Sequence, residues 1–563
     1  MNRSNTTHAA VICHSTSVTA RRALTLIEML IGMAITLLMM AAIVNLFANI
    51  SSGVKIRRAT MEMSSELRIA RATLFNDLAG ATCRALPWQR PDEDPGYLEI
   101  IDGSWSDWEP SILTDGIDDP NNGELNYATS LVPSAGDPAV FPPAGPAVPN
   151  AITNGRGLGD HDCILALTVQ SETAPFQGTL PVWNSATNRW DPSTIESNFA
   201  EVIWYVVENP ASGSLGEPGM RTLYRRVLLI APWVSDLPPV TGAASAQKNV
   251  SRDIEYYRLS DISFRHDGDL RIPNTLGDLA KRENRFAHRR NLDGSGGGLG
   301  WPYIMDQFVI RLFPIDIVSP LINRDSPLRP FGAPFQPDLL TIDDHLTYLP
   351  DRLGEDVMLT NVLAFDLRVF DPGAPLVEVG GAVLGPDDGG WNPALGPIVG
   401  YGDYVSLGWS PAYSDPGLPR ANYVPPTGAP TPLFREPHTP GWHPSDPNNA
   451  LTRNYWATYD TWSFHYEHDG INQDQDFLDA GATPSIDEGT NGLDDRDPTG
   501  GGDPLWVDHV DDIAVNGVDD IFERETSPPY PVPLRGMQVK LRIYEPETRQ
   551  IREATVTRSF VPQ

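Results

Sequence analysis

Hydrophobic and polar positions divide the N-terminal part of the chain into two helical patterns. From Leu24 to Phe47 the chain is apolar on every side, and Glu28 is its only charged residue. At about 1.5 Å per residue these positions form a helix of roughly 36 Å, which is long enough to cross the hydrocarbon core of a bilayer. A carboxylate near the middle of such a span costs on the order of 2.5–3.5 kcal/mol, and less near an end. We therefore expect Glu28 to have a partner.

Beyond Ser51-Ser52-Gly53 the pattern narrows to a single stripe. Apolar residues recur at steps of three and four, at Ile56, Ala59, Met63, Leu67, Ala70, Leu74 and Leu78. This spacing is typical of a helix that buries one face, and Pro87 marks its latest end. The sequence predicts one continuous helix, with residues 24–50 in a membrane or a helical bundle and residues 51–86 packed on a globular domain.

Short apolar segments rich in Val, Ile, Tyr and Phe follow, and they are separated by turn residues. They predict strands at Ile164–Ser171, Glu201–Glu208, Thr222–Ala231, Ile254–Arg265, Gln307–Phe313, Val362–Phe370, Gln538–Tyr544 and Ile551–Thr557. No strand–helix–strand alternation occurs, so the sheet should be mostly antiparallel. The predicted fold class is α+β: a long N-terminal helix packed on an antiparallel β domain with long irregular insertions.

The 53 Pro and 48 Gly residues favour long loops. Asp92–Asp160 is expected to be irregular. The domain organisation predicted is a β domain at 87–371, a Gly/Pro/Asp-rich insertion at 372–529, and a C-terminal hairpin at 530–563 that completes the sheet. The net charge of -32 makes nucleic acid an unfavourable partner and suits divalent cations or basic partners.

The start of the chain resembles the processing signal of type IV prepilins and pseudopilins. Arg21, Arg22 and Ala23 precede an apolar helix that begins Leu24-Thr25-Leu26-Ile27-Glu28. The resemblance implies that a prepilin peptidase removes residues 1–23, cleaving between Ala23 and Leu24, and that Leu24 becomes the N-methylated terminus. The family more often has Gly before the cut and Phe after it. Glu28 is then the fifth mature residue, which in this family pairs with the terminal amino group of a neighbouring subunit and governs assembly.

Later motifs resemble the J-type minor pseudopilins of type II secretion. They are Leu74-Phe75-Asn76-Asp77-Leu78 at the helix end, Leu223-Tyr224-Arg225-Arg226 in a strand, and Val362-Leu-Ala-Phe365-Asp-Leu-Arg368 in a later strand, followed by the closing hairpin. The resemblance covers residues 24–90 most clearly, and the remaining length is expected as insertions into a pilin-like domain.

This resemblance implies a minor pseudopilin, not an enzyme, that helps to initiate a type II secretion pseudopilus at its tip. Its partners would be the prepilin peptidase and other pseudopilins or minor pilins. It would be a single-pass inner-membrane protein with a short cytoplasmic N-terminus and a periplasmic domain, or lie in an extracellular fibre. One alternative is a minor subunit of a type IV pilus whose insertion binds surfaces. Another is a membrane-anchored hydrolase, for which the sequence offers acids but no catalytic constellation.

Loss of the leader would remove Cys13 and leave Cys83 and Cys163 outside the cytoplasm. They could form a disulfide or remain two separate buried thiols.

Two acidic segments of the insertion share the pattern Asp-x-x-x-Asn-Gly-x-Asp-Asp. Their oxygen-bearing side chains are the ligand types that calcium prefers. The alternative is that these residues form turns on a solvated surface. The candidate calcium ligands are Asp487, Asn491, Asp494, Asp495, Asp512, Asn516, Asp519, Asp520 and Glu523.

Overall fold

In the computed structural model the chain divides into two compact units, Met1–Met61 and Glu62–Gln563. The structure describes residues 26–89, 95–102, 163–208, 221–241, 248–249, 256–257, 259–286, 288–289, 303–304, 356–388, 391, 396–409, 425–435, 457–463, 530–546, 548 and 550–561. The predicted strand at Gln307–Phe313 lies outside these residues.

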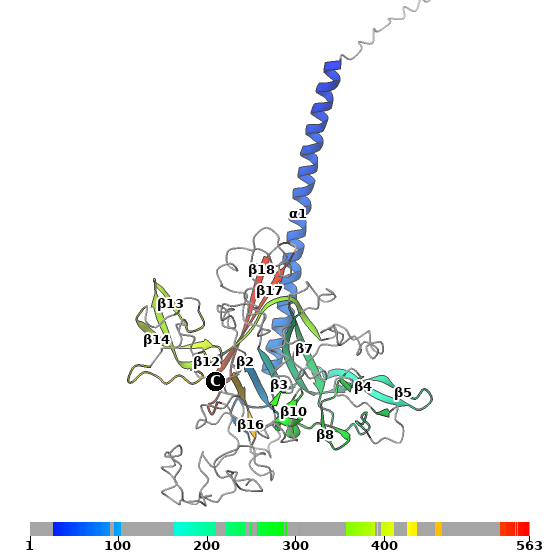
Figure 1. Ribbon diagram of the computed structural model, residues 1–563, viewed down its shortest axis with the longest axis vertical. Coiled ribbons are helices and arrows are strands. Elements are labelled where there is room, and N and C mark those ends of the chain that lie inside the picture. Colours follow the sequence, from blue (N-terminus) through cyan, green and yellow to red (C-terminus); the bar gives the residue numbers. More distant parts are fainter. Residues whose placement is uncertain are drawn as a thin grey trace, which may run out of the picture. The chain divides into compact units, whose positions relative to one another are not determined.

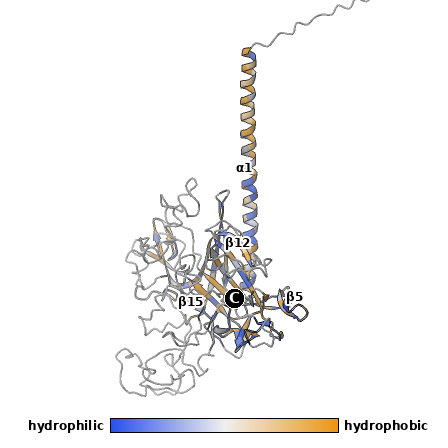
Figure 2. Cartoon of the chain, turned by 45° about the vertical axis from the view of Figure 1, so that its right-hand side comes forward, coloured by the Kyte–Doolittle hydropathy of each residue, from blue (hydrophilic) through white to orange (hydrophobic). Residues whose placement is uncertain are grey.

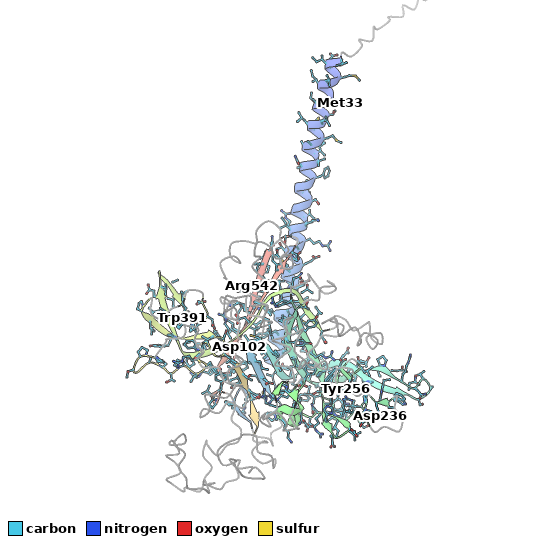
Figure 3. All side chains as sticks on the ribbon, viewed as in Figure 1. Met33, Asp102, Asp236, Tyr256, Trp391 and Arg542 are labelled. Atoms are coloured by element: carbon cyan, nitrogen blue, oxygen red, sulfur yellow. The ribbon has the colours of Figure 1, made fainter. Side chains whose placement is uncertain are left out.

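The N-terminal helix α1 runs from Leu26 to Ala79 (Figure 1). Its segment Leu26–Phe47 has a mean hydropathy of 2.3 and is long and apolar enough to cross a membrane. Figure 2 shows this apolar part in orange. The side chains described there are exposed on all sides, and Met33 projects outward in Figure 3. The prediction of a long helix with an all-round apolar first half is confirmed.

In the second unit the predicted stripe is buried. Met63, Leu67, Ala70, Leu74 and Leu78 are all at most 5% exposed and pack in one core with residues of the sheet. The helix ends earlier than Pro87 because Gly80 follows Ala79 and the chain then passes the end of strand β3 (Ile164–Gln170). The N–H of Gln170 donates to the carbonyl of Gly80 at 2.8 Å, and a Cβ on Gly80 would lie 2.5 Å from the oxygen of Gln170.

The second unit is built on a ten-stranded sheet with the order β15-β2-β3-β6-β7-β12-β17-β18, to which β13 and β14 are added through β12. Its strand pairs are all antiparallel. The strands are β2 (Leu98–Asp102), β3 (Ile164–Gln170), β6 (Phe199–Glu208), β7 (Arg221–Leu229), β12 (Val357–Val379), β13 (Ala382–Leu384), β14 (Ile398–Val405), β15 (Ala457–Asp460), β17 (Gly536–Glu545) and β18 (Gln550–Ser559). An α+β architecture with an antiparallel sheet is therefore present, as the sequence predicts.

Smaller elements surround this sheet. The described ones are the hairpin β4 (Phe176–Asn184) with β5 (Arg189–Ser197), the hairpin β8 (Phe264–Asp267) with β9 (Leu270–Pro273), the pair β10 (His288–Arg289) with β11 (Tyr303–Ile304), the parallel pair β1 (Trp88–Gln89) with β16 (Trp462–Ser463), and the short helices α5 (Leu276–Leu279) and η3 (Arg282–Asn284).

The central strands are buried on both faces. On β6, Trp204 and Val206 face the core that contains the helix stripe, whereas Ile203 and Tyr205 face a second core. Residues from the segment after β7 fill that second core, among them Tyr256, Tyr257, Leu279 and Phe286. The central part of the sheet is therefore a layer between the C-terminal part of α1 and this covering segment.

Three sequence predictions need correction. The described part of Ile254–Arg265 is not one continuous strand, because Tyr256 and Tyr257 are helical, the carbonyl of Tyr256 accepts the N–H of Ser260, and β8 starts only at Phe264. The described part of Asp92–Asp160 contains the fully buried strand β2 instead of an irregular loop. Segment 372–529, expected as an irregular insertion, continues β12 to Val379 and supplies β13, β14 and β15 to the main sheet. Isolated short strands gain their partners only from distant parts of the chain, so local pattern does not reveal them.

The packing around Gly96 can be tested by comparing alanine substitutions at Gly96 and Gly268. Gly96 has φ +72°, and a Cβ there would lie 2.0 Å from Oγ1 of Thr168, whereas Gly268 has φ +58° with nothing within 4 Å. We expect Gly268→Ala to lower the free energy of unfolding by about 1 kcal/mol and Gly96→Ala by roughly 3 kcal/mol or more, because only the second adds a steric clash to the backbone strain. Chemical denaturation of the purified variants measures both, and equal losses would contradict the packing described.

Candidate functional site: the N-terminal helix and its anchor on the sheet

Glu28 is the acidic residue of the first turn of α1. Its side chain is exposed, as are its apolar neighbours Ile27, Met29 and Leu30. Farther along, the hydroxyl of Thr36 donates to the carbonyls of Gly32 (3.0 Å) and Met33 (2.8 Å), so this polar group is satisfied within the helix. Glu28 is thus a carboxylate on a helix whose other surface suits lipid or neighbouring apolar helices. The predicted processing residues Ala23 and Leu24 lie outside the described residues.

At the other end of α1, Asp77 fixes the helix on the sheet. Its carboxylate accepts two hydrogen bonds from the guanidinium of Arg225, both at 2.7 Å, and one from the indole N–H of Trp204 at 2.9 Å. Trp204 and Arg225 are direct cross-strand neighbours on β6 and β7. The side chain of Asp77 is 4% exposed and that of Arg225 is 16% exposed. A bidentate pair in this environment fixes both position and orientation. The two sequence motifs at 74–78 and 223–226 therefore meet in one ion pair.

A second polar cluster lies in the other core. Glu99 on β2 stands opposite Asp460 on β15, and the side chains of both are fully buried. Two guanidinium groups bridge these carboxylates. Arg282 contacts Glu99, and its Nε lies 2.9 Å from Oδ2 of Asp460. Nη1 of Arg285 lies 2.8 Å from Oδ1 of Asp460 and 3.4 Å from Oε2 of Glu99. His288 Nε2 is 2.9 Å from Glu99. The cluster therefore ties three distant segments of the chain together.

The surroundings shift the pKa values of Glu99 and Asp460 in opposite directions. Burial raises the pKa of Glu99, but Arg282 and His288 outweigh burial and hold it well below its usual range. Burial also raises the pKa of Asp460, to about 6, and the charge of Glu99 adds to this rise against the opposing effect of Arg285. Burial lowers the pKa of His288 in spite of Glu99, so the imidazole is neutral at pH 7.

Next to this cluster, Glu201 is fully satisfied by neighbouring donors. It accepts hydrogen bonds from the hydroxyls of Tyr97 (2.7 Å) and Ser263 (2.6 Å) and from the N–H of Phe286 (2.8 Å). Burial raises the pKa of Glu201. These groups are buried and bond to one another, which is the arrangement of a structural polar cluster.

The sequence did not identify Glu99, Asp460, Arg282 or Arg285 as a cluster. The available signal was a single acid within an apolar strand, as in Tyr97-Leu98-Glu99-Ile100-Ile101. Such an acid is buried only when it is paired. The partners could not be named because they are far apart in the sequence.

Of the two alternatives that the sequence leaves open for Cys83 and Cys163, a disulfide or two separate thiols, the structure shows the second. Both cysteines are buried free thiols. The thiol of Cys83 lies 4.0 Å from the hydroxyl of Thr461, and the thiol of Cys163 donates to Asp102 at 3.3 Å. Burial raises the pKa of Cys83 to about 12, which keeps it a thiol and makes it unreactive. Two buried cysteines with separate partners form the alternative that the sequence left open.

The nine candidate calcium ligands, from Asp487 to Glu523, lie outside the described residues, so calcium binding stays a prediction. Among the residues that the structure describes, no group of three or more His, Cys, Asp or Glu side chains could hold a metal ion.

In comparison with known proteins, no family model, no curated protein and no solved structure matches this chain.

The anchor at Asp77 can be tested by a double-mutant cycle. Removing one member leaves a buried charge without its counterion, so Asp77→Ala and Arg225→Ala should each lower the free energy of unfolding by roughly 3–5 kcal/mol. Their combination should cost much less than the sum, because the charges are coupled. The more exposed pair Arg189–Asp191, whose side chains are 72% and 34% exposed, is the control, and its removal should cost at most about 1 kcal/mol. Additive losses at Asp77 and Arg225 would contradict the anchor.

The raised pKa of Asp460 predicts a pH dependence of stability. Its ordinary value is 3.8 and its value in the folded chain is about 6. Between these pH values the folded chain binds a proton that the unfolded chain does not, so this group stabilises the fold as the pH falls through 6. Relative to Asp460→Asn, the wild type should therefore gain on the order of 1 kcal/mol between pH 7 and pH 5. Thermal unfolding in matched buffers measures this difference, and a constant or shrinking difference would show that Asp460 stays ionised at pH 5.

Proposed function

We propose that this chain is a minor pseudopilin-like subunit that a prepilin peptidase processes and that assembles through its N-terminal helix into a type II secretion pseudopilus, in the tip or initiation complex. The observation that carries the proposal is the division of α1. One part is apolar on all sides with a single acid, Glu28, in its first turn, and the other part is bound to an antiparallel sheet through a buried stripe and Asp77. A subunit that polymerises by its helix needs both properties in one element.

The role of Glu28 follows from the cost of charge in hydrocarbon. After cleavage before Leu24, the new α-amino group of one subunit and the carboxylate of Glu28 in the next would each be costly alone. Pairing neutralises both and fixes the axial register between two helices. The membrane, the prepilin peptidase and neighbouring pilin-like subunits are the partners of this mechanism. The domain from Glu62 onward would lie in the periplasm and meet other minor subunits.

The identity and methylation of the first residue test whether the chain is a processed pilin-like protein. Mass spectrometry of the chain purified from membranes should show N-methyl-Leu24 as the first residue. A chain that retains Met1, or one cut elsewhere, would contradict the proposal.

The assembly role of Glu28 is tested by substitution. Glu28→Ala should leave membrane insertion and the fold of the sheet domain intact, and reduce incorporation into the fibre by at least tenfold, because the partner's amino group is left without a counterion. Asp77→Asn is the contrasting variant, since it weakens the sheet domain but leaves the membrane helix unchanged. The amount of chain that co-isolates with sheared fibres measures incorporation, and normal incorporation of Glu28→Ala would refute the pairing. Recovery from the cell surface, rather than from the membrane, would favour the alternative of a type IV pilus subunit.

A further inference from the structure

Three basic residues follow the apolar part of α1 within a single turn of helix. Lys55, Arg57 and Arg58 are all exposed. The chain as a whole carries 73 acidic and 41 basic residues, so three basic residues within four positions are a local reversal of its charge, and the next acid along the helix is Glu62. Hydrophilic residues can be seen to follow the apolar part of the helix in Figure 2.

The depth of this cluster matches the headgroup layer of a bilayer. Leu26–Phe47 spans roughly 33 Å at about 1.5 Å per residue, which fills the hydrocarbon core. Lys55 begins roughly 12 Å farther along the axis. Helical side chains tilt toward the helix N-terminus, so these long side chains reach back toward the membrane surface. The exposed residues Ile50, Val54 and Ile56 give the intervening helix an apolar surface suited to the interface.

The three cations surround the helix instead of lining one face. At about 100° per residue, Lys55 and Arg57 lie roughly 160° apart, with Arg58 offset from both. A protein partner would contact one side of the helix, whereas lipid headgroups surround it. The arrangement around the axis therefore favours phospholipid over an acidic protein surface.

We propose that Lys55, Arg57 and Arg58 form a binding site for the phosphate groups of anionic phospholipids, in the leaflet at the C-terminal end of the membrane span. The site fixes the depth of α1 in the membrane. It rests on the membrane-spanning part of the proposed function but not on cleavage or assembly. If the leader with Arg21 and Arg22 is removed, this cluster is the remaining basic anchor of the helix next to the bilayer, and a subunit that leaves the membrane must release these lipids.

The test compares two pairs of arginines on the same helix. The full-length chain is reconstituted into phosphatidylcholine vesicles, and electron spin resonance measures the relative association of spin-labelled phosphatidylglycerol and phosphatidylcholine with the protein. Arg57→Gln/Arg58→Gln is the test variant. Arg68→Gln/Arg71→Gln is the control, because it removes two exposed arginines of the same helix beyond the headgroup layer. Gln preserves helix propensity in both.

The wild type and the control should prefer phosphatidylglycerol over phosphatidylcholine. In the test variant this preference should be at least fivefold weaker, because each basic residue at an anionic surface contributes about 1 kcal/mol. Raising the salt from about 0.05 M to about 0.5 M should weaken the wild-type preference. An unchanged preference in the test variant, or none in the wild type, would overturn the proposal. So would a variant that keeps its lipid preference but loses incorporation into fibres, because the cluster would then bind an acidic protein surface. An unmethylated N-terminus would sink the proposed function without altering the lipid result.

Discussion

The bidentate pair between Asp77 and Arg225 decides where the N-terminal helix sits on the sheet. An acid in the last turn of a helix is disfavoured by the helix dipole, so Asp77 is stable there only because Arg225 and Trp204 supply three hydrogen bonds. The apolar stripe selects which side of the helix faces the sheet, but hydrophobic contact has no direction and tolerates sliding. The ion pair removes that freedom. Gly80 then ends the helix where the chain must pass against β3.

On the opposite face of the sheet, buried charges join segments that are far apart in the sequence. Glu99 and Asp460 are directly opposed across β2 and β15, an arrangement that is destabilising on its own. Arg282 and Arg285 make it tolerable by bridging both acids. The edge strand β15 and the segment that covers the second core are therefore interdependent, since neither set of charges can be buried without the other. An apolar cluster of the same volume could be more stable, but it would not specify which distant segment pairs with β2.

The sequence was most informative where structure depends on local periodicity. The stripe from Met63 to Leu78, the strands β3, β6, β7, β17 and β18, and the antiparallel sheet all follow from spacing and residue type. It failed where an element depends on a distant partner. β15 is four residues long and pairs with β2, which is far away in the sequence, and Tyr256 is helical with its ring in the second core. The sequence could not decide between a disulfide and two separate thiols for the same reason: only the fold shows that each thiol lies beside a different hydrogen-bond partner. Asp77 and Arg225 were singled out separately, and only the fold shows that they touch.

The functional proposal depends on the change in hydrophobic pattern along α1 more than on any single residue. A helix that is apolar all round cannot remain in water, whereas a helix with one apolar stripe needs only one covering surface. The first condition holds from Leu26 to Phe47 and the second from Met63 to Leu78, and the basic residues Lys55, Arg57 and Arg58 lie between them. The first stretch is suited to hydrocarbon and the second to packing on a sheet in water, and the basic residues lie between the two. Within the apolar stretch, Glu28 alone violates the pattern. A carboxylate at that position is costly in hydrocarbon unless a counterion neutralises it, and the proposed pairing with a terminal amino group would supply one.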